Sequence, residues 1–167
     1  MDVKQKERQQ RGQDFQDELR RSWRQVPNCW RMRIPDGRGG TRPADELILL
    51  QNCSILGEHK RTTLTRFELS FLEVNQIKGL LDFDKVISHN LGMLFVSFLN
   101  EKEERDLAVT FRLVHAMRYM KDLGRKYITI EEFEKEVIPC VWLPRIELDG
   151  NLGYDLKGVS YDCYKFM

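Results

Sequence analysis

The spacing of apolar residues in the N-terminal segment predicts a helix. Phe15, Leu19 and Trp23 recur every fourth residue, between charged and amide side chains. This spacing places the three side chains in one stripe of a helix over residues 4–23. Pro27 follows closely and marks the end of that helix.

Three further helices are predicted downstream. One spans residues 71–83, and another spans 113–123 and ends at Gly124, a residue common at helix C-termini. Thr129, followed by Glu131 and Glu132, has the character of an N-cap that begins a short helix. The buried face of the helix over 71–83 is expected to comprise Leu72, Val74, Ile77, Leu80 and Leu81.

The predicted strands are separated by polar or turn-forming segments. They cover residues 29–34, 46–50, 54–60, 92–99 and 106–112. Beyond Pro139 no regular pattern is found, and the chain is expected to be irregular there. The order helix, three strands, helix, two strands, helix, short helix and tail predicts an α/β (α+β) fold, with a single mixed central β-sheet flanked by helices.

Composition fits a soluble protein. Of the 167 residues, 41% are hydrophobic and 32% are charged, as in an ordinary globular domain. There is no apolar run near the roughly 20 residues of a membrane helix and no apolar core of a secretory signal, so a cytoplasmic location is the default. The four cysteines lack metal-finger spacing and are expected to be reduced, half-buried thiols, and the three histidines form no ligand set by spacing.

Charge is unevenly distributed although the net charge is only +1. Residues 1–66 contain 14 Lys and Arg against 9 Asp and Glu, whereas residues 67–167 contain 13 against 17. The basic first part favours a polyanionic partner. A solvated basic surface would give the same charge distribution, so a function has to be inferred from specific residues.

Asp45, Glu58 and Lys60 form the most informative constellation. A hairpin turning near Asn52 would place Asp45 opposite residues 58–60, and strand alternation puts Glu58 and Lys60 on one face and His59 on the other. Two carboxylates suit Mg²⁺, and a nearby ammonium can orient or deprotonate an attacking water. The alternative is that Asp45 is a turn residue and 58–60 the solvated end of a strand. The hairpin register decides whether the three side chains share a face.

The sequence resembles the PD-(D/E)XK nuclease superfamily, most closely the RecU-type Holliday junction resolvases and their phage-borne relatives. The motifs that carry the resemblance run through most of the chain: Arg11-Gly12 with Phe15, Arg42-Pro43-Ala44-Asp45, Glu58-His59-Lys60, Asn75-Gln76, Gly92-Met93-Leu94-Phe95-Val96 and Pro144-Arg145-Ile146. The resemblance implies a restriction-endonuclease-like core in residues 1–139. Residues 140–167 would pack on the same domain.

The resemblance also implies an active site. Asp45 and Glu58 would bind Mg²⁺, with Mn²⁺ able to substitute, and the backbone carbonyl of His59 would be a third ligand. Lys60 would be the catalytic lysine. Gln76 would line the site and bond a metal-bound water or the phosphate, and the alternative for that position is a surface amide on an amphipathic helix.

Two positions depart from the family pattern. The first helix of the family commonly supplies a Glu to the metal, whereas this chain has Gln16, followed by Asp17 and Glu18. Glu18 is therefore a candidate further ligand. The family engages the junction centre with a protruding stalk, and the matching segment here is only the loop over residues 35–43.

The resemblance implies a homodimer that cuts branched DNA, because two symmetric cuts require two sites. The arginines that flank the motif are the expected contacts to the DNA backbone, namely Arg38, Arg42, Arg61 and Arg66. Two rival functions stay open. One is a nuclease of the same superfamily that acts on other DNA, and the other is a DNA-binding protein that keeps the fold without cutting.

Overall fold

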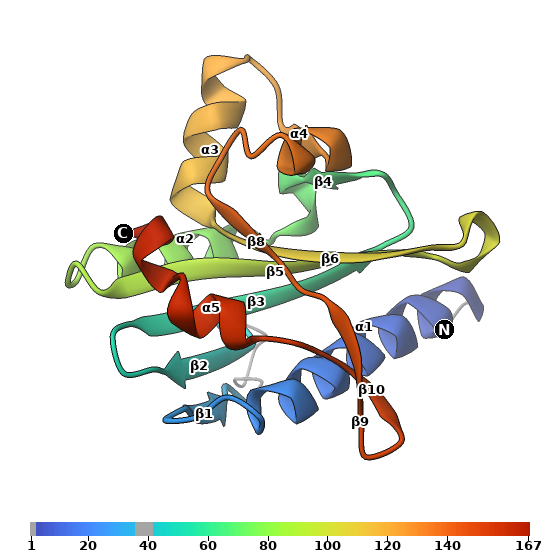
Figure 1. The fold of residues 1–167 in the computed structure, drawn as a ribbon. Coiled ribbons are helices and arrows are strands. Elements are labelled where there is room, and N and C mark those ends of the chain that lie inside the picture. Colours follow the sequence, from blue (N-terminus) through green and yellow to red (C-terminus); the bar gives the residue numbers. More distant parts are fainter. Residues whose placement is uncertain (1–2, 36–41) are drawn as a thin grey trace.

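A six-stranded mixed β-sheet lies at the centre of the protein in a computed structural model, which describes residues 3–35 and 42–167 (Figure 1). The strand order is β1-β2-β3-β5-β6-β8. Only β3 and β5 run parallel, joined by the crossover helix α2, as a parallel connection requires. The prediction of a single mixed central sheet flanked by helices is confirmed. The bounds are β1 (Trp30–Arg33), β2 (Glu46–Leu49), β3 (Ser54–Thr62), α2 (Val74–Asp84), β5 (Asn90–Asn100), β6 (Arg105–Arg112) and β8 (Cys140–Trp142).

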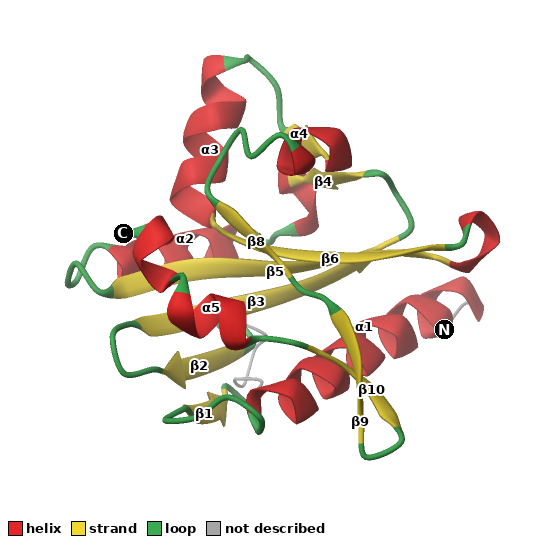
Figure 2. Cartoon of the chain, in the orientation of Figure 1, coloured by secondary structure: helices red, strands yellow, loops and turns green. Residues whose placement is uncertain are grey.

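One face of the sheet is covered by α2, α3 (Leu113–Asp122) and α4 (Ile130–Glu134), together with a small sheet of β4 (Arg66–Glu68) and β7 (Tyr127–Thr129) and the 3₁₀ helix η1 (Leu69–Phe71) (Figure 2). Their apolar side chains form a core with the strands, which includes Leu80, Leu94, Phe111 and Phe133. A side chain at Gly92 would lie 2.9 Å from the Leu80 carbonyl carbon, so glycine there lets α2 pack directly on β5.

The opposite face is covered by α1 (Val3–Trp23) and by the C-terminal segment (Figure 1). Phe15, Leu19 and Trp23 are all buried on it, so the apolar stripe predicted for α1 is confirmed. The C-terminal segment adds buried side chains to the same core, namely Tyr154, Leu156, Val159, Cys163 and Phe166. Two cores therefore sandwich one sheet.

The expectation of an irregular chain beyond Pro139 is wrong. This region contains β8, the hairpin of β9 (Arg145–Leu148) and β10 (Asn151–Tyr154), the helix α5 (Lys157–Tyr161) and the 3₁₀ helix η3 (Cys163–Phe166). Its strands are three or four residues long, too short for alternation to be visible in the sequence. β4 and β7 were not predicted for the same reason.

The helix predicted over residues 71–83 begins later, at Val74. Glu73 is its N-cap and forms a capping box with Gln76, which fixes the start of the helix. Val74 was expected on the buried face but is 83% exposed, because the buried stripe of α2 runs through Gln76 and Leu80. The other predicted helix ends are confirmed: Gly124 has φ of +65°, and Thr129 caps α4 through Glu132.

The remaining expectations concern turns, thiols and membrane helices. The acidic turn between β5 and β6 contains the 3₁₀ helix η2 (Glu101–Glu103).

All four cysteines are free, and only Cys29 is not fully buried. In the described part of the chain, no helix has the length and hydropathy to cross a bilayer.

Candidate metal centre

The β2–β3 hairpin carries Asp45 to the middle of β3. Residues 46–49 pair with 57–54 in an antiparallel register, and the turn closes with a 2.9 Å bond from the Leu50 N–H to the Cys53 carbonyl. Asp45 directly precedes β2, and its N–H donates to the Gly57 carbonyl at 3.0 Å. The His59 N–H donates to Asp45 Oδ2 at 2.8 Å. Asp45 therefore lies at the edge of β3, beside residues 57–59.

The Asp45 carboxylate is buried and has partners from two other segments. Gln16 Nε2 of α1 donates to Oδ1 at 3.1 Å, and Arg42 Nη2 forms an ion pair with the same oxygen at 2.6 Å. Gln16 is the position at which the family pattern has an acid. Here the side chain at that position supports Asp45 through an amide rather than adding negative charge.

Glu58 and Lys60 lie on the opposite face of β3, toward α2. Glu58 Oε1 accepts from Gln76 Nε2 at 2.6 Å and pairs with Lys60 Nζ at 2.8 Å, and Lys60 also donates to Gln76 Oε1 at 3.3 Å. The side chain of Glu58 is almost fully buried. Its second oxygen, Oε2, has no hydrogen-bond partner among the described residues.

The ionised form of Glu58 is disfavoured in this environment. Burial raises the pKa of Glu58, the charge of Asp45 raises it further, and Lys60 opposes both effects. The charges of the two carboxylates are therefore close enough to interact. A buried carboxylate that lacks a partner on one oxygen, beside a second carboxylate, is stabilised by a cation.

The three side chains expected on one face are not held from one face, because Asp45 is held by α1, whereas Glu58 and Lys60 are held by α2. Between the described residues, no hydrogen bond or ion pair links Asp45 to Lys60. No group of three or more His, Cys, Asp or Glu side chains in residues 3–35 and 42–167 is arranged to hold a metal. What the described residues offer is two carboxylates and backbone oxygens, a donor set that fits Mg²⁺, which keeps several waters.

A buried pair of side chains that the sequence did not predict lies behind Asp45. His59 Nε2 lies 2.7 Å from Glu46 Oε1, and Trp23 Nε1 donates to the same oxygen at 3.2 Å. Arg31 pairs with Glu46 Oε2. Burial alone would raise the pKa of Glu46, but His59 and Arg31 outweigh it, and the pKa is lowered. The one feature of the sequence that could have indicated this buried pair was the Glu at the start of an apolar strand.

For His59, burial favours the neutral ring, but the charge of Glu46 outweighs it and raises the pKa. Its ring packs edge-on against Phe15 and Phe95. His59 Nδ1 is buried 3.7 Å from Asp45 Oδ2. Strand alternation therefore turns this ring away from Glu58 and toward α1, where it lies beside Asp45 without a hydrogen bond to it.

Helix α2 also fixes the segment that precedes Asp45. Asn75 Nδ2 donates to the Arg42 carbonyl at 2.8 Å. A side chain at Gly79 would lie 2.9 Å from Pro43 Cα, so a glycine is needed where this segment crosses the helix. Gln76 Oε1 accepts the Glu73 N–H at 2.9 Å. The same side chain therefore caps the start of α2 and contacts Glu58.

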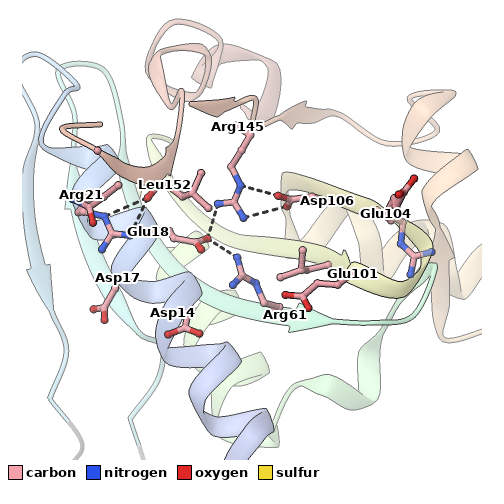
Figure 3. A pocket seen from close by; sticks show the side chains of 14 residues that line it. Asp14, Asp17, Glu18, Arg21, Arg61, Glu101, Glu104, Asp106, Arg145 and Leu152 are labelled. Atoms are coloured by element: carbon pink, nitrogen blue, oxygen red, sulfur yellow. Dashed lines mark hydrogen bonds and ion pairs between the residues drawn. The ribbon is translucent and has the colours of Figure 1, made fainter. Parts of the chain in front are cut away.

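Glu18 is not part of this cluster. Its carboxylate pairs with Arg61 Nη2 at 2.5 Å and with Arg145 Nη1 at 2.7 Å, and Arg145 also pairs with Asp106 at 2.9 Å. These groups line a cavity of about 780 Å³ between α1, the β5–β6 turn and the β9–β10 hairpin (Figure 3). No bond from Glu18 to Asp45 or Glu58 is found in the described part of the chain.

The four arginines expected to contact DNA are placed differently. The side chain of Arg61 is 3% exposed and also donates to Ser97 Oγ and Tyr154 OH, so Arg61 is a structural residue and not a surface contact. Arg66 is exposed and pairs with Glu68, and Arg42 pairs with Asp45. Arg38 and most of the predicted loop over residues 35–43 lie outside the described residues.

Comparisons with known proteins give a weak structural likeness but no match to a family or to a curated protein. No protein-family model and no curated protein matches this chain at a significant level. Among solved structures, it is similar to Archaeoglobus fulgidus Hjc, a Holliday junction resolvase from an archaeal hyperthermophile. The identity is 13%, the match covers 75% of this chain and 89% of that chain, and the TM-score is 0.46. A likeness at this level says nothing about activity.

Proposed function

We propose that this chain is a metal-dependent endonuclease that hydrolyses phosphodiester bonds in branched DNA such as a Holliday junction. The observation that carries the proposal is the environment of Glu58. One of its oxygens is bound by Lys60 and Gln76, the other is buried without a partner among the described residues, and Asp45 lies close enough to raise its pKa. These are the residues on which the sequence resembles the PD-(D/E)XK superfamily.

Asp45 and Glu58 would hold the metal, with the His59 carbonyl as a further ligand. The N–H of His59 projects toward Asp45, and in a regular strand the carbonyl of the same residue projects from the same edge. When bound, Mg²⁺ or Mn²⁺ supplies Lewis-acid stabilisation of the phosphate and lowers the pKa of a bound water. Gln16 and the His59 N–H keep the Asp45 carboxylate oriented.

Lys60 would act on the attacking water or on the charge that develops at phosphorus. Its ammonium is held between Glu58 Oε1 and Gln76 Oε1, so its direction is fixed before substrate arrives. Gln76 is neutral and orients both side chains of the Glu-x-Lys strand. Such preorganisation is where positioning residues contribute most to catalysis.

The DNA would be held at this centre by contacts between its phosphates and the side chains of Arg38, Arg42 and Arg66. Phosphate contacts of this kind supply affinity without sequence information. Two symmetric cuts in a four-way junction require two centres, which a two-fold homodimer would provide. The proposed substrate is therefore a branched DNA engaged by two copies of the chain.

The decisive assay uses purified protein with an end-labelled four-way junction, plain duplex and single strand, each with and without Mg²⁺. Metal-dependent cutting of the junction supports the proposal, and equal cutting of plain duplex would point to a nuclease with another DNA substrate. Binding without any cutting would point to a non-cutting DNA-binding protein. Asp45→Ala should reduce cleavage by about 10³-fold, or about 4 kcal/mol, and leave DNA binding largely intact. Glu101→Gln, in an exposed turn, is the matched control.

A further inference from the structure

A groove between α2 and α3 is separate from the carboxylate cluster. It has a volume of about 680 Å³ and is lined by residues of η1, of α2 and its C-cap, of α3 and of the segment that follows α3. Leu81 of α2 and the C-cap Lys85 lie at the C-terminal end of the helix, whereas Gln76 of the metal centre is in the first turn. The groove and the metal centre therefore use opposite ends of one helix.

The floor of the groove is apolar. It is formed by Leu69, Leu81, Val114, Met117 and Met120. Met120 is buried, whereas the other four are only partly covered. Partly covered apolar side chains in a concave surface gain free energy when a partner excludes water from them. Methionine side chains adapt their shape to a partner, and they are common at surfaces that bind peptides.

The rim of the groove carries charge of a single sign. Its charged lining residues are Lys85, Arg118, Lys121, Arg125 and Lys126, and no acidic side chain lines it. Arg125 pairs with Glu132, and Lys85 lies 4.0 Å from Asp82. For Arg118, Lys121 and Lys126, no ion pair is found among the described residues. Five cations around an apolar floor, on a chain of net charge +1, are complementary to an acidic apolar partner.

We infer that this groove binds an acidic amphipathic segment of another protein, seated as a helix with its apolar side chains between α2 and α3. Helix-in-groove recognition uses apolar anchors at i, i+3, i+4 and i+7, and here acidic residues beside the anchors would meet the rim cations. Nucleic acid would satisfy the rim but not the apolar floor. A second copy of this chain is a poorer fit, because its exposed acidic turn, Glu101–Glu103, contains no apolar side chain.

The test is NMR of the full chain labelled at its methionine methyl groups, titrated with a synthetic helical peptide that has leucines at the anchor positions and glutamates between them. The signals of Met117 and Met120 should shift on titration, and those of methionines outside the groove should not. The same peptide with lysines in place of glutamates should not bind. A fluorescent version of the acidic peptide gives the affinity by anisotropy.

Variants locate the contact on the chain. Lys121→Glu combined with Lys126→Glu should weaken binding of the acidic peptide by about tenfold or more, as should Met117→Ala, while circular dichroism shows an unchanged fold. Lys102→Glu, in the exposed β5–β6 turn, should leave the affinity unchanged. An acidic peptide that leaves both methionine signals in place would overturn the inference. So would a DNA duplex that shifts them instead, or shifts that appear on self-association without peptide.

Discussion

Gln76 Nε2 donates a 2.6 Å hydrogen bond to Glu58 Oε1, while Gln76 Oε1 accepts the N–H of Glu73 and a proton of Lys60. One amide thus links the first turn of α2 to both ends of the Glu-x-Lys element on β3. Because the side chain is neutral, it adds no charge to a cluster that already holds two carboxylates. The start of the helix and the orientation of Glu58 are therefore coupled.

Removal of this amide should affect both stability and cleavage. Gln76→Ala leaves Glu58 with one fewer donor and α2 without half of its capping box, which should cost about 1–3 kcal/mol of unfolding free energy. Urea denaturation measures that loss, and the cleavage assay should show a lower rate because Lys60 loses a partner. Gln51→Ala, at the exposed hairpin turn, is the control. An unchanged stability and rate in Gln76→Ala would show that this buried amide contributes to neither.

The hairpin register explains how much of the site the sequence could reveal. Asn52 and the apolar runs on either side predicted the β2–β3 turn, and a short turn fixes which residues lie opposite each other. That register brings Asp45 next to Glu58 along the strands, but Asp45 is held from the α1 face and Glu58 from the α2 face, which the register alone did not predict. Glu73-x-x-Gln76 lacks the Ser or Thr that usually begins a capping box, so the start of α2 at Val74 rather than at Phe71 was not predicted.

Other features depended on contacts between distant segments, which leave no local pattern. Glu46 is fully buried against His59, Trp23 and Arg31, and no spacing rule connects a residue of α1 with the start of β2. Glu18 was a candidate metal ligand because of its place on α1. Arg145, 127 positions later, is one of the two residues that hold it instead.

Mg²⁺ should stabilise the folded chain, and Glu58→Gln should abolish that effect. At a concentration about 100 times Kd, an ion that binds only the folded state adds about 2.7 kcal/mol, or about 5–10 °C in Tm for a chain of this size. Differential scanning calorimetry with Mg²⁺ and then with excess EDTA measures the shift. Glu101→Gln should respond like the unchanged chain. An equal response in Glu58→Gln would remove Glu58 from the ligand set.

The pH dependence of stability without metal follows from the raised pKa of Glu58. A raised pKa means that the folded state holds the proton more tightly than the unfolded state. The contribution of Glu58 to stability is therefore fully present below the ordinary carboxyl pKa of about 4.3, and it is lost as the pH rises through the folded value. Glu58→Gln should remove this loss and be more stable than the unchanged chain at pH 7 without metal. Parallel stability curves for the two chains between pH 4 and pH 7 would contradict this.

Glu18 should be important for stability rather than for chemistry. Glu18→Gln leaves Arg61 buried beside a neutral side chain, and the loss of one partner of a buried ion pair costs about 3–5 kcal/mol. Chemical denaturation should show this loss. Asp106→Asn, which removes the more exposed partner of Arg145, should cost less. Glu18 would regain its candidacy as a metal ligand if Glu18→Gln kept its stability but no longer bound Mg²⁺.

Alkaline pH should weaken the fold through its buried thiols. Burial raises the pKa of Cys140 to about 11 and that of Cys53 to about 12, where the neighbouring Cys163 adds to the effect. Because the folded state keeps these thiols protonated, their contribution is complete below the ordinary thiol pKa of about 8.5 and is lost as the pH rises toward 11–12. The urea midpoint should therefore fall between pH 8.5 and pH 11, and Cys140→Ala should reduce that fall even though the variant starts from a lower stability. Burial also raises the pKa of Cys29, the least buried thiol, so Cys29→Ala should reduce the fall by less. A fall of the same size in Cys140→Ala as in the unchanged chain would assign the effect to other groups.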